Sequence, residues 1–249
     1  MKFQNKVVLI TGASSGIGAA AAKLFTQEGA SVVIVGRNQE KLAKVETECA
    51  ALGNRPLVIR ADVVNDEEAK KIIKTTIDKY GKLDVLVNNA GIARYGFVVD
   101  GSVMKSFDEV MNVNLRAAVH ITSLASPHLV KTKGNVVNIS SVLGSCVKGK
   151  AHVAYCVSKA ALDQFTRAAA VELAAHGVRV NCISPGPVNT DIQLNSGLET
   201  NWERAIAATA LNRMSEPEEV AELIVFVASD SAKGITGSNY VTDNGLMLT

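Results

Sequence analysis

The sequence VVLITGASSGIG at residues 7–18 constrains the fold of this chain more than any other stretch. Residues 7–10 form a short continuous apolar run, which is typical of a strand covered on both faces in a parallel sheet. A glycine-rich turn follows, and the alanine-rich residues 19–25 then predict a helix that stops near Gly29. The stretch therefore predicts a buried strand, a turn and a helix, in that order.

The turn contains Gly12, Gly16 and Gly18, a spacing that differs from the usual G-x-G-x-x-G fingerprint of dinucleotide-binding folds. Glycine suits a tight turn and lets backbone N–H groups approach a pyrophosphate. The start of the following helix supplies further donors and partial positive charge. A P-loop does not fit, because its Gly-Lys-Ser/Thr ending is missing. The turn therefore predicts a dinucleotide site.

The second predicted strand, residues 30–35, indicates which dinucleotide is bound. NAD-binding folds place a carboxylate about 20 residues beyond the glycines, where it bonds the ribose 2′-hydroxyl. In this chain Gly36 and then Arg37 follow the strand. A guanidinium can hold a 2′-phosphate in a fork, so the sequence favours NADP(H), with NAD(H) possible. Ser15, just before the second glycine, is not basic and offers no second cation.

Further apolar runs at residues 57–63, 83–88, 134–141, 179–186 and 239–242 alternate with helical patterns, which predicts a parallel sheet with right-handed crossovers. Asp62, near the end of the third strand, has two interpretations: it bonds the adenine amino group, or it caps the helix at residues 67–80. Asn112 and Asn114 fall inside the helix expected at residues 107–129, which indicates a local bond or a kink there.

The 249 residues are 47% hydrophobic and carry a formal net charge of +2, which predicts one globular domain over residues 1–249. The balanced charge gives no argument for a nucleic-acid partner. No apolar run approaches the roughly 20 residues of a membrane helix, and the first strand leaves no room for a signal peptide. The cysteines have no metal-ligand or C-x-x-C spacing, so we expect no metal site, free thiols and a cytoplasmic location. They are Cys49, Cys146, Cys156 and Cys182.

Taken together, the motifs resemble the short-chain dehydrogenase/reductase family over residues 5–245. They are the glycine turn, Asn88-Asn89-Ala90-Gly91, Asn114, Ser141, Tyr155-Cys156-Val157-Ser158-Lys159, and Pro185-Gly186 followed by Thr190. The resemblance implies a Rossmann-type α/β fold, with a doubly wound parallel sheet of about seven strands and helices on both faces. It also implies an NAD(P)(H)-dependent oxidoreductase that assembles as a homotetramer or homodimer.

The resemblance implies four catalytic residues: Asn114, Ser141, Tyr155 and Lys159. Tyr155 and Lys159 are four apart and therefore share one helical face. A free tyrosine has a pKa of about 10, and we expect the Lys159 ammonium and an oxidised nicotinamide to lower it. Tyr155 would then exchange a proton with the substrate oxygen, which Ser141 would also bond. Lys159 would bind ribose hydroxyls, and Asn114 would hold a water linking Lys159 to solvent.

The cofactor-binding residues expected on this basis extend along the whole chain. They are Gly12, Ser14, Ser15, Gly16, Ile17, Gly18, Arg37, Asp62, Val63, Asn89, Ala90, Gly91, Tyr155, Lys159, Pro185, Gly186, Val188 and Thr190. Two departures from the family pattern stand out. The loop from Ser141 to Tyr155 is about one residue longer than is common, and Asp243-Asn244-Gly245 replaces the frequent Asp-Gly-Gly.

The substrate is the least constrained part of the interpretation. Residues 93–95, 142–152 and 187–188 and a mobile segment at residues 190–214 are expected to form a pocket with an apolar bias, in part from Leu194 and Leu198. This favours a lipophilic ketone or secondary alcohol, such as a steroid or terpenoid, with a 3-oxoacyl thioester as the alternative. His152 either contacts the substrate or has no role. A non-catalytic dinucleotide sensor is the alternative of another class, and the four catalytic positions argue against it.

Overall fold

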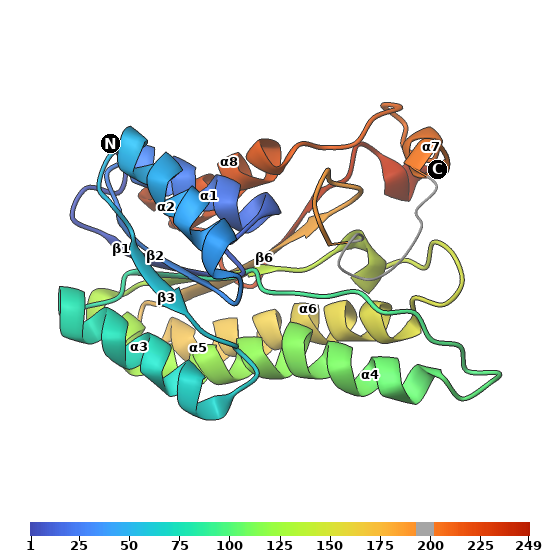
Figure 1. The fold of residues 1–249 in the computed structure, drawn as a ribbon, viewed down its shortest axis with the longest axis horizontal. Helices are drawn as coiled ribbons and strands as arrows, with labels where there is room; N and C mark the ends of the chain where they lie inside the picture. The colour runs from blue at the N-terminus through green and yellow to red at the C-terminus, as the bar shows by residue number, and fades with distance from the viewer. Residues whose placement is uncertain (193–201) are drawn as a thin grey trace.

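A computed structural model describes residues 1–192 and 202–249 of the chain. Its centre is one parallel sheet of seven strands in the order β3-β2-β1-β4-β5-β6-β7 (Figure 1). The strands are β1 (Val7–Thr11), β2 (Ser31–Gly36), β3 (Leu57–Arg60), β4 (Val85–Asn88), β5 (Asn135–Ile139), β6 (Arg179–Pro185) and β7 (Asn239–Thr242). The expected Rossmann-type doubly wound sheet is confirmed.

Strand β1 lies in the middle of the sheet and pairs with β2 on one side and β4 on the other. All five of its residues are buried, as the apolar run predicted. The chain winds outward from β1 through β2 to β3, then returns to β4 and winds the other way. Ligands bind beyond the carboxyl ends of the strands at such a reversal point. The glycine turn after β1 stands at this point.

Helices cover both faces of the sheet (Figure 1). Helices α1 (Gly16–Gln27), α2 (Gln39–Leu52) and α8 (Pro217–Ala228) pack on one face, and their apolar side chains join those of the strands in one core. Helices α3 (Asp66–Tyr80), α5 (Ala117–Thr132) and α6 (Val153–Ala174) form a second core on the other face. Because both faces are buried, the strands consist of near-continuous apolar runs rather than alternating ones.

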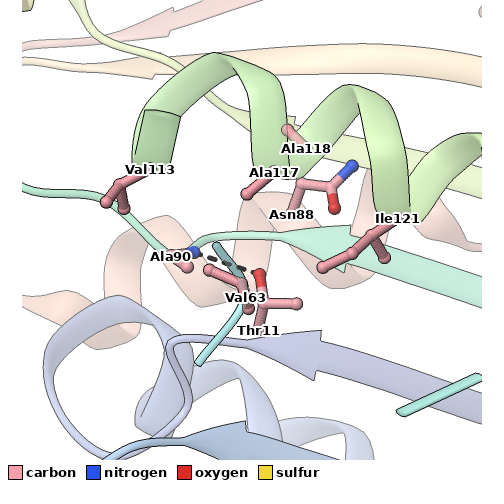
Figure 2. A pocket seen from close by; sticks show the side chains of 8 residues that line it. All are labelled: Thr11, Val63, Asn88, Ala90, Val113, Ala117, Ala118 and Ile121. Atoms are coloured by element: carbon pink, nitrogen blue, oxygen red, sulfur yellow. Dashed lines mark hydrogen bonds between the residues drawn. The ribbon is translucent and has the colours of Figure 1, made fainter. Parts of the chain in front are cut away.

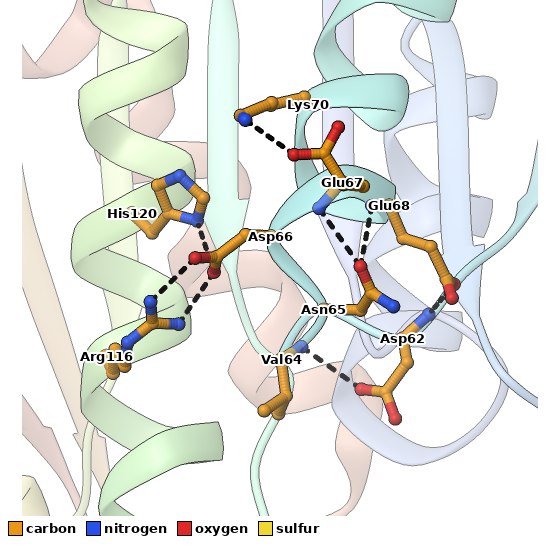
Figure 3. Close-up of polar contacts among 9 residues, drawn as sticks. All are labelled: Asp62, Val64, Asn65, Asp66, Glu67, Glu68, Lys70, Arg116 and His120. Carbon is orange, nitrogen blue, oxygen red and sulfur yellow. Dashed lines mark hydrogen bonds and ion pairs between the residues drawn. The ribbon is translucent and has the colours of Figure 1, made fainter.

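The start of α3 is capped by Asn65, whose Oδ1 accepts bonds from the N–H groups of Glu67 and Glu68 at 3.0 and 3.2 Å (Figure 3). The prediction that Asp62 caps this helix is therefore wrong. Strand β3 ends at Arg60, earlier than expected, and Asp62 lies in the connecting turn, where its Oδ1 accepts from the Val64 N–H at 3.1 Å. Its carboxylate thus stays beside the strand end and does not reach the helix start.

The long helix expected at residues 107–129 is interrupted where its two asparagines occur. Helix α4 (Val103–Met111) runs into a π-helical turn, η1 (Asn112–Arg116), and then into α5. The predicted local irregularity is confirmed, because a π-helical turn shifts the side chains that follow it around the helix axis. Arg116, at the end of η1, binds Asp66 of α3 through two bonds of 2.7 and 2.8 Å (Figure 3). This pair fixes the turn against α3.

The segment expected to cover the site is described only in part. Residues 193–201, with Leu194 and Leu198, lie outside the described residues, and α7 (Trp202–Ala207) follows them. Short 3₁₀ turns η2 (Val142–Gly144), η4 (Asp230–Ala232) and η5 (Leu246–Leu248) complete the described elements. The four cysteines are free thiols, as expected. Of the helices that the structure describes, none is long and apolar enough to span a bilayer.

Candidate active site

The glycine turn is held by side chains from the neighbouring strand ends. Gly12 has a φ of +66°, which favours glycine, and a Cβ on Gly18 would lie 2.5 Å from the Gly12 carbonyl oxygen. Asn89 Nδ2 donates to the carbonyl oxygens of Thr11 and Gly12, each at 3.0 Å. The Thr11 hydroxyl accepts in turn from the Ala90 N–H at 3.1 Å, beside a cavity of about 10 Å³ (Figure 2). Hydrogen bonds therefore hold the turn after β1 against the turn after β4.

Helix α1 begins directly after this turn and points its start toward the cleft. Within the described part of the chain, no side-chain hydrogen bond caps it at Ser15. The first-turn N–H groups of an uncapped helix need other partners, and a phosphate is the group that such a helix start binds best. The turn and the helix start together therefore fit a pyrophosphate, as the sequence predicted.

A cleft of about 1370 Å³ runs along the carboxyl ends of the strands. That exceeds the 300–1,000 Å³ of an ordinary small-ligand pocket and suits a dinucleotide plus a substrate. All but two of the site residues predicted from the sequence line it; the exceptions are Gly18 and Asn114. Gly18 packs against Gly12 and Asn89 on the side of the turn away from the cleft, where a Cβ would not fit. Asn114 is buried. The described lining residues also include some that sequence reasoning missed, among them Asn38 and Lys41.

The cleft end beyond β2 is rich in charge. Arg37 is 69% exposed, and its Nη1 lies 3.9 Å from Asp62 Oδ2, too far for a strong bond. Lys41, one helical turn further into α2, lines the same end and binds Asp191 at 2.5 Å. Lys41 is thus a second cation that lines the cleft, whereas the sequence offered none at Ser15. No local signal marks Lys41 in the sequence, because Arg37 precedes the Asn38 cap of α2 and the two residues do not share a helical face.

Tyr155 and Ser141 meet in the middle of the cleft. Ser141 follows β5 and Tyr155 belongs to the first turn of α6, and both side chains line the cleft. Burial raises the pKa of Tyr155 to about 12, although Ser141 acts in the opposite direction. The expected lowering of this pKa by Lys159 is not seen, because burial raises the pKa and Lys159 is not among the groups that shift it. The phenol is neutral at physiological pH, which is the form that a proton donor requires.

Lys159 is 3% exposed and donates from Nζ to the Ile139 carbonyl oxygen at 2.8 Å. The same nitrogen lies 5.5 Å from the centroid of the Tyr155 ring. Burial lowers the pKa of Lys159 to about 8, and the negative charge of Asp163 partly offsets this effect. A lysine with such a pKa is still largely protonated at neutral pH, so a positive charge stands beside the tyrosine.

The side chain of Asn114 fastens three segments together. Its Oδ1 accepts from the Ile92 N–H at 2.8 Å, and its Nδ2 donates to the Ile92 carbonyl oxygen at 3.0 Å and to Ser158 Oγ at 3.1 Å. These bonds connect the π-helical turn with the loop after β4 and with α6. The expected water at Asn114 stays a prediction.

The substrate end of the cleft is mixed in character. Ile92, Leu143, Val188 and Leu246 supply apolar lining, as the sequence favoured. His152 also lines this end, with its ring 4.9 Å from that of Tyr95 in an edge-to-face arrangement, and burial lowers its pKa. Lys148 and Lys150 line this end as well, on either side of Gly149 with its φ of +98°, and both fall within the expected pocket residues 142–152.

Comparisons with known proteins agree with this geometry. A family profile described as "Enoyl-(Acyl carrier protein) reductase" matches residues 12–247. The chain is 36% identical to 3-oxoacyl-[acyl-carrier-protein] reductase FabG of Thermotoga maritima, with 100% of each chain covered. It is 37% identical to the meso-2,3-butanediol dehydrogenase of Serratia marcescens, over 98% of this chain and 96% of the relative.

Solved structures give the same result. A short-chain dehydrogenase/reductase from Caenorhabditis elegans, solved with its cofactor, superposes with a TM-score of 0.94 at 34% identity, over 100% of this chain and 97% of that one. A short-chain dehydrogenase from Burkholderia cenocepacia in complex with NADP superposes with a TM-score of 0.93 at 32% identity, over 99% of this chain and 100% of that one. This similarity spans the full fold and includes the strand ends that carry the site. The chain therefore belongs to the short-chain dehydrogenase/reductase family and is an oxidoreductase.

Proposed function

We propose that this protein, in one domain of residues 1–249, transfers a hydride between NADP(H) and a carbonyl or secondary alcohol. The observation that carries the proposal is the convergence of Ser141, Tyr155 and Lys159 at one point of a cleft that begins at the glycine turn. A neutral phenol, a second hydroxyl in the same cleft and a buried ammonium are the groups that reduction of a carbonyl requires.

Tyr155 would donate its proton to the substrate oxygen, and Ser141 would hydrogen-bond the same oxygen as it gains negative charge. The bound nicotinamide would supply or accept the hydride. Lys159 would stabilise the phenolate that remains on Tyr155 after proton transfer, because its ammonium lies beside the ring. Lys159 also retains donors beyond its bond to Ile139, and these would bind ribose hydroxyls.

The proposed preference for NADP(H) rests on Arg37 and Lys41, two cations at the end of the cleft where the adenosine ribose would lie. A 2′-phosphate binds strongly to such a pair, whereas a 2′-hydroxyl gains little from it. Asp62 would bond the adenine amino group. NAD(H) remains a possible cofactor, because the ion pairs of Arg37 with Asp62 and of Lys41 with Asp191 already satisfy part of the positive charge.

For the substrate we propose a lipophilic ketone, such as a steroid or terpenoid, on the apolar lining of the substrate end. The alternative is a 3-oxoacyl thioester, the type of substrate that the name of the Thermotoga maritima relative indicates. The alternative of another class is a non-catalytic dinucleotide sensor.

A substrate screen tests these proposals together. NADPH consumption is measured with steroid ketones, terpenoid carbonyls, small diketones and an acetoacetyl thioester, and NADPH binding is measured in parallel by fluorescence. Tyr155→Phe serves as the blank, and Tyr80→Phe on α3, outside the cleft, serves as the matched control. Turnover by the wild type and Tyr80→Phe but not by Tyr155→Phe supports the reductase and names its substrate class. Tight NADPH binding without turnover of any member favours the sensor.

We also propose a cytoplasmic homotetramer, or a homodimer. The outer face of α6 supports self-association, because Val157 and Val171 on it are 42% and 81% exposed. Light scattering after size-exclusion chromatography gives the mass directly. A monomer at micromolar concentration would contradict the proposed assembly.

A further inference from the structure

A buried carboxylate lies one helical turn beyond the lysine of the candidate active site. Asp163 lies four residues after Lys159 on α6, so both side chains occupy the inner face of that helix. Asp163 is 4% exposed and Lys159 is 3% exposed. Asp163 is not among the residues that line the cleft, so it has no access to cofactor or substrate.

Every recorded side-chain partner of this carboxylate is a hydrogen-bond donor. Asn239 Nδ2 donates to Oδ2 at 3.2 Å, and the Cys182 thiol donates to Oδ1 at 3.6 Å. Burial raises the pKa of Asp163, while the bonds from Ser140 and Cys182 hold that pKa down. Donors thus contact both oxygens, an arrangement that favours the ionised form of the carboxyl against the effect of burial.

The position of the carboxylate is also fixed sterically. A Cβ on Gly144, in the 3₁₀ turn η2 after Ser141, would lie 2.9 Å from Asp163 Oδ2. The carboxylate is therefore enclosed by α6, β6, β7 and η2, and it cannot turn away from Lys159 toward solvent. Its charge acts through the dry interior of the protein, where charges interact much more strongly than in water.

The titratable groups facing this pair come from several elements. Lys159 has Tyr155 on its own helix and Cys182 on β6, and Asp163 has Cys182 together with the exposed Arg167 one turn further along α6. Burial, with the negative charge of Asp163 as the next contribution, raises the pKa of Cys182 to about 12, so this thiol stays neutral. Within the part of the chain that the structure describes, Asp163 is thus the carboxylate whose charge bears on Lys159.

We propose that Asp163 is a positioning residue that keeps Lys159 protonated in the interior and thereby acts on proton transfer at Tyr155. This inference rests on the proposed roles of Tyr155 and Lys159. A merely structural Asp163, which only connects β6, β7 and α6, would affect stability equally whether or not Lys159 carries a charge. The two roles therefore differ in their dependence on pH and on Lys159.

A double-mutant cycle on stability tests the pairing without any substrate. Asp163→Asn is made in the wild type and in Lys159→Met, and urea midpoints are measured at about pH 6.5 and about pH 9.5, on either side of the Lys159 pKa of about 8. We expect Asp163→Asn to lower the midpoint more in the wild type than in Lys159→Met at the lower pH. At the higher pH the two losses become equal. If Asp163→Asn lowers the midpoint equally in the two backgrounds at both pH values, the proposal is overturned. A difference between the two backgrounds that is the same at both pH values would also overturn it.

Asp84→Asn is the matched control, because Asp84 is a second buried aspartate, located just before β4 and paired with Lys82 at 3.0 Å. Asp84→Asn should lower the urea midpoint by the same amount in the wild type and in Lys159→Met. If Asp163→Asn does not fold, Asp163→Ser replaces it, because serine is also neutral and smaller than the enclosed site.

The pH profile of NADPH-dependent reduction gives the functional readout. Without the negative charge of Asp163, Lys159 loses its proton more easily, so the alkaline limb should move to lower pH by about one unit in Asp163→Asn. In Asp84→Asn the limb should not move. An unmoved limb in Asp163→Asn would contradict the proposed role. If Tyr155→Phe retains full turnover, the proposed function fails, while the double-mutant cycle still decides whether Asp163 and Lys159 are coupled.

Discussion

Lys159 Nζ lies 5.5 Å from the centroid of the Tyr155 ring and at the same time donates to the Ile139 carbonyl oxygen at 2.8 Å. The bond to the end of β5 fixes the ammonium, and the helical spacing of four residues fixes the ring beside it. The charge that proton transfer requires is therefore set by the sheet and by α6 before any ligand binds.

The buried Lys159 should make stability depend on pH. Its pKa falls from 10.5 to about 8 on folding, so folding disfavours the charged form, a cost of up to about 3 kcal/mol at neutral pH. The stability of the wild type relative to Lys159→Met should therefore rise as the pH increases from about 8 to about 10.5. Urea unfolding of both proteins across this range measures the difference, and a constant difference would contradict the lowered pKa.

Arg37→Ala should weaken NADPH binding more than NADH binding. A charge-assisted bond to a phosphate contributes roughly 1.5–3 kcal/mol, so the affinity for NADPH should fall by roughly tenfold or more. Arg60→Ala is the matched control, because Arg60 is exposed at the end of the neighbouring strand β3 and does not line the cleft. Fluorescence titration with both cofactors provides the measurement. Equal losses for NADPH and NADH would remove the assignment of the 2′-phosphate.

Gly18→Ala should disrupt the turn that follows β1. Its Cβ would lie 2.5 Å from both the Gly12 carbonyl oxygen and Asn89 Nδ2, and such overpacking costs about 1–3 kcal/mol. Gly234→Ala is the comparison, since nothing lies within 4 Å of a Cβ there. Thermal melts and NADPH titrations of both variants should show losses for Gly18→Ala alone. A Gly18→Ala variant with wild-type stability and affinity would refute the close approach.

Removal of the side-chain cap at the start of α3 should lower the stability of the protein. Asn65→Ala removes the acceptor of two N–H groups at the start of α3, which costs about 1 kcal/mol. The loss should be measurable by urea unfolding, and Asn54→Ala, at an exposed position between α2 and β3, should have no such effect. Equal midpoints for the two variants would contradict a stabilising cap at Asn65.

Local signals in the sequence predicted most of the fold. Apolar runs of four to seven residues marked buried strands, and alternation with helical patterns implied the parallel order. The irregularity around Asn112 and Asn114 was also predictable, because asparagine competes for local bonds inside a helix. Even the unusual Asn244 has a physical reason, since it adopts a φ of +52°, a conformation that asparagine tolerates better than most residues.

The features that sequence reasoning missed depend on contacts between distant segments. Asp163 lies in a helix whose other buried positions are mostly apolar, and only β6, β7 and η2 together enclose its carboxylate. Lys41 resembles any solvated lysine until the cleft brings it beside Arg37 and Asp191. Asn65 rather than Asp62 caps α3, because β3 ends before the expected residue. Which of two nearby residues caps a helix depends on the tertiary structure, which the local sequence does not contain.

The most direct test of the account is the rate of NADPH oxidation with the best ketone, in the wild type and in Tyr155→Phe at saturating NADPH. Loss of the proton donor should lower kcat by about 10²–10⁴-fold, while the Kd for NADPH stays close to that of the wild type. A Tyr155→Phe variant that keeps the wild-type rate would contradict the assignment of Tyr155 as the general acid.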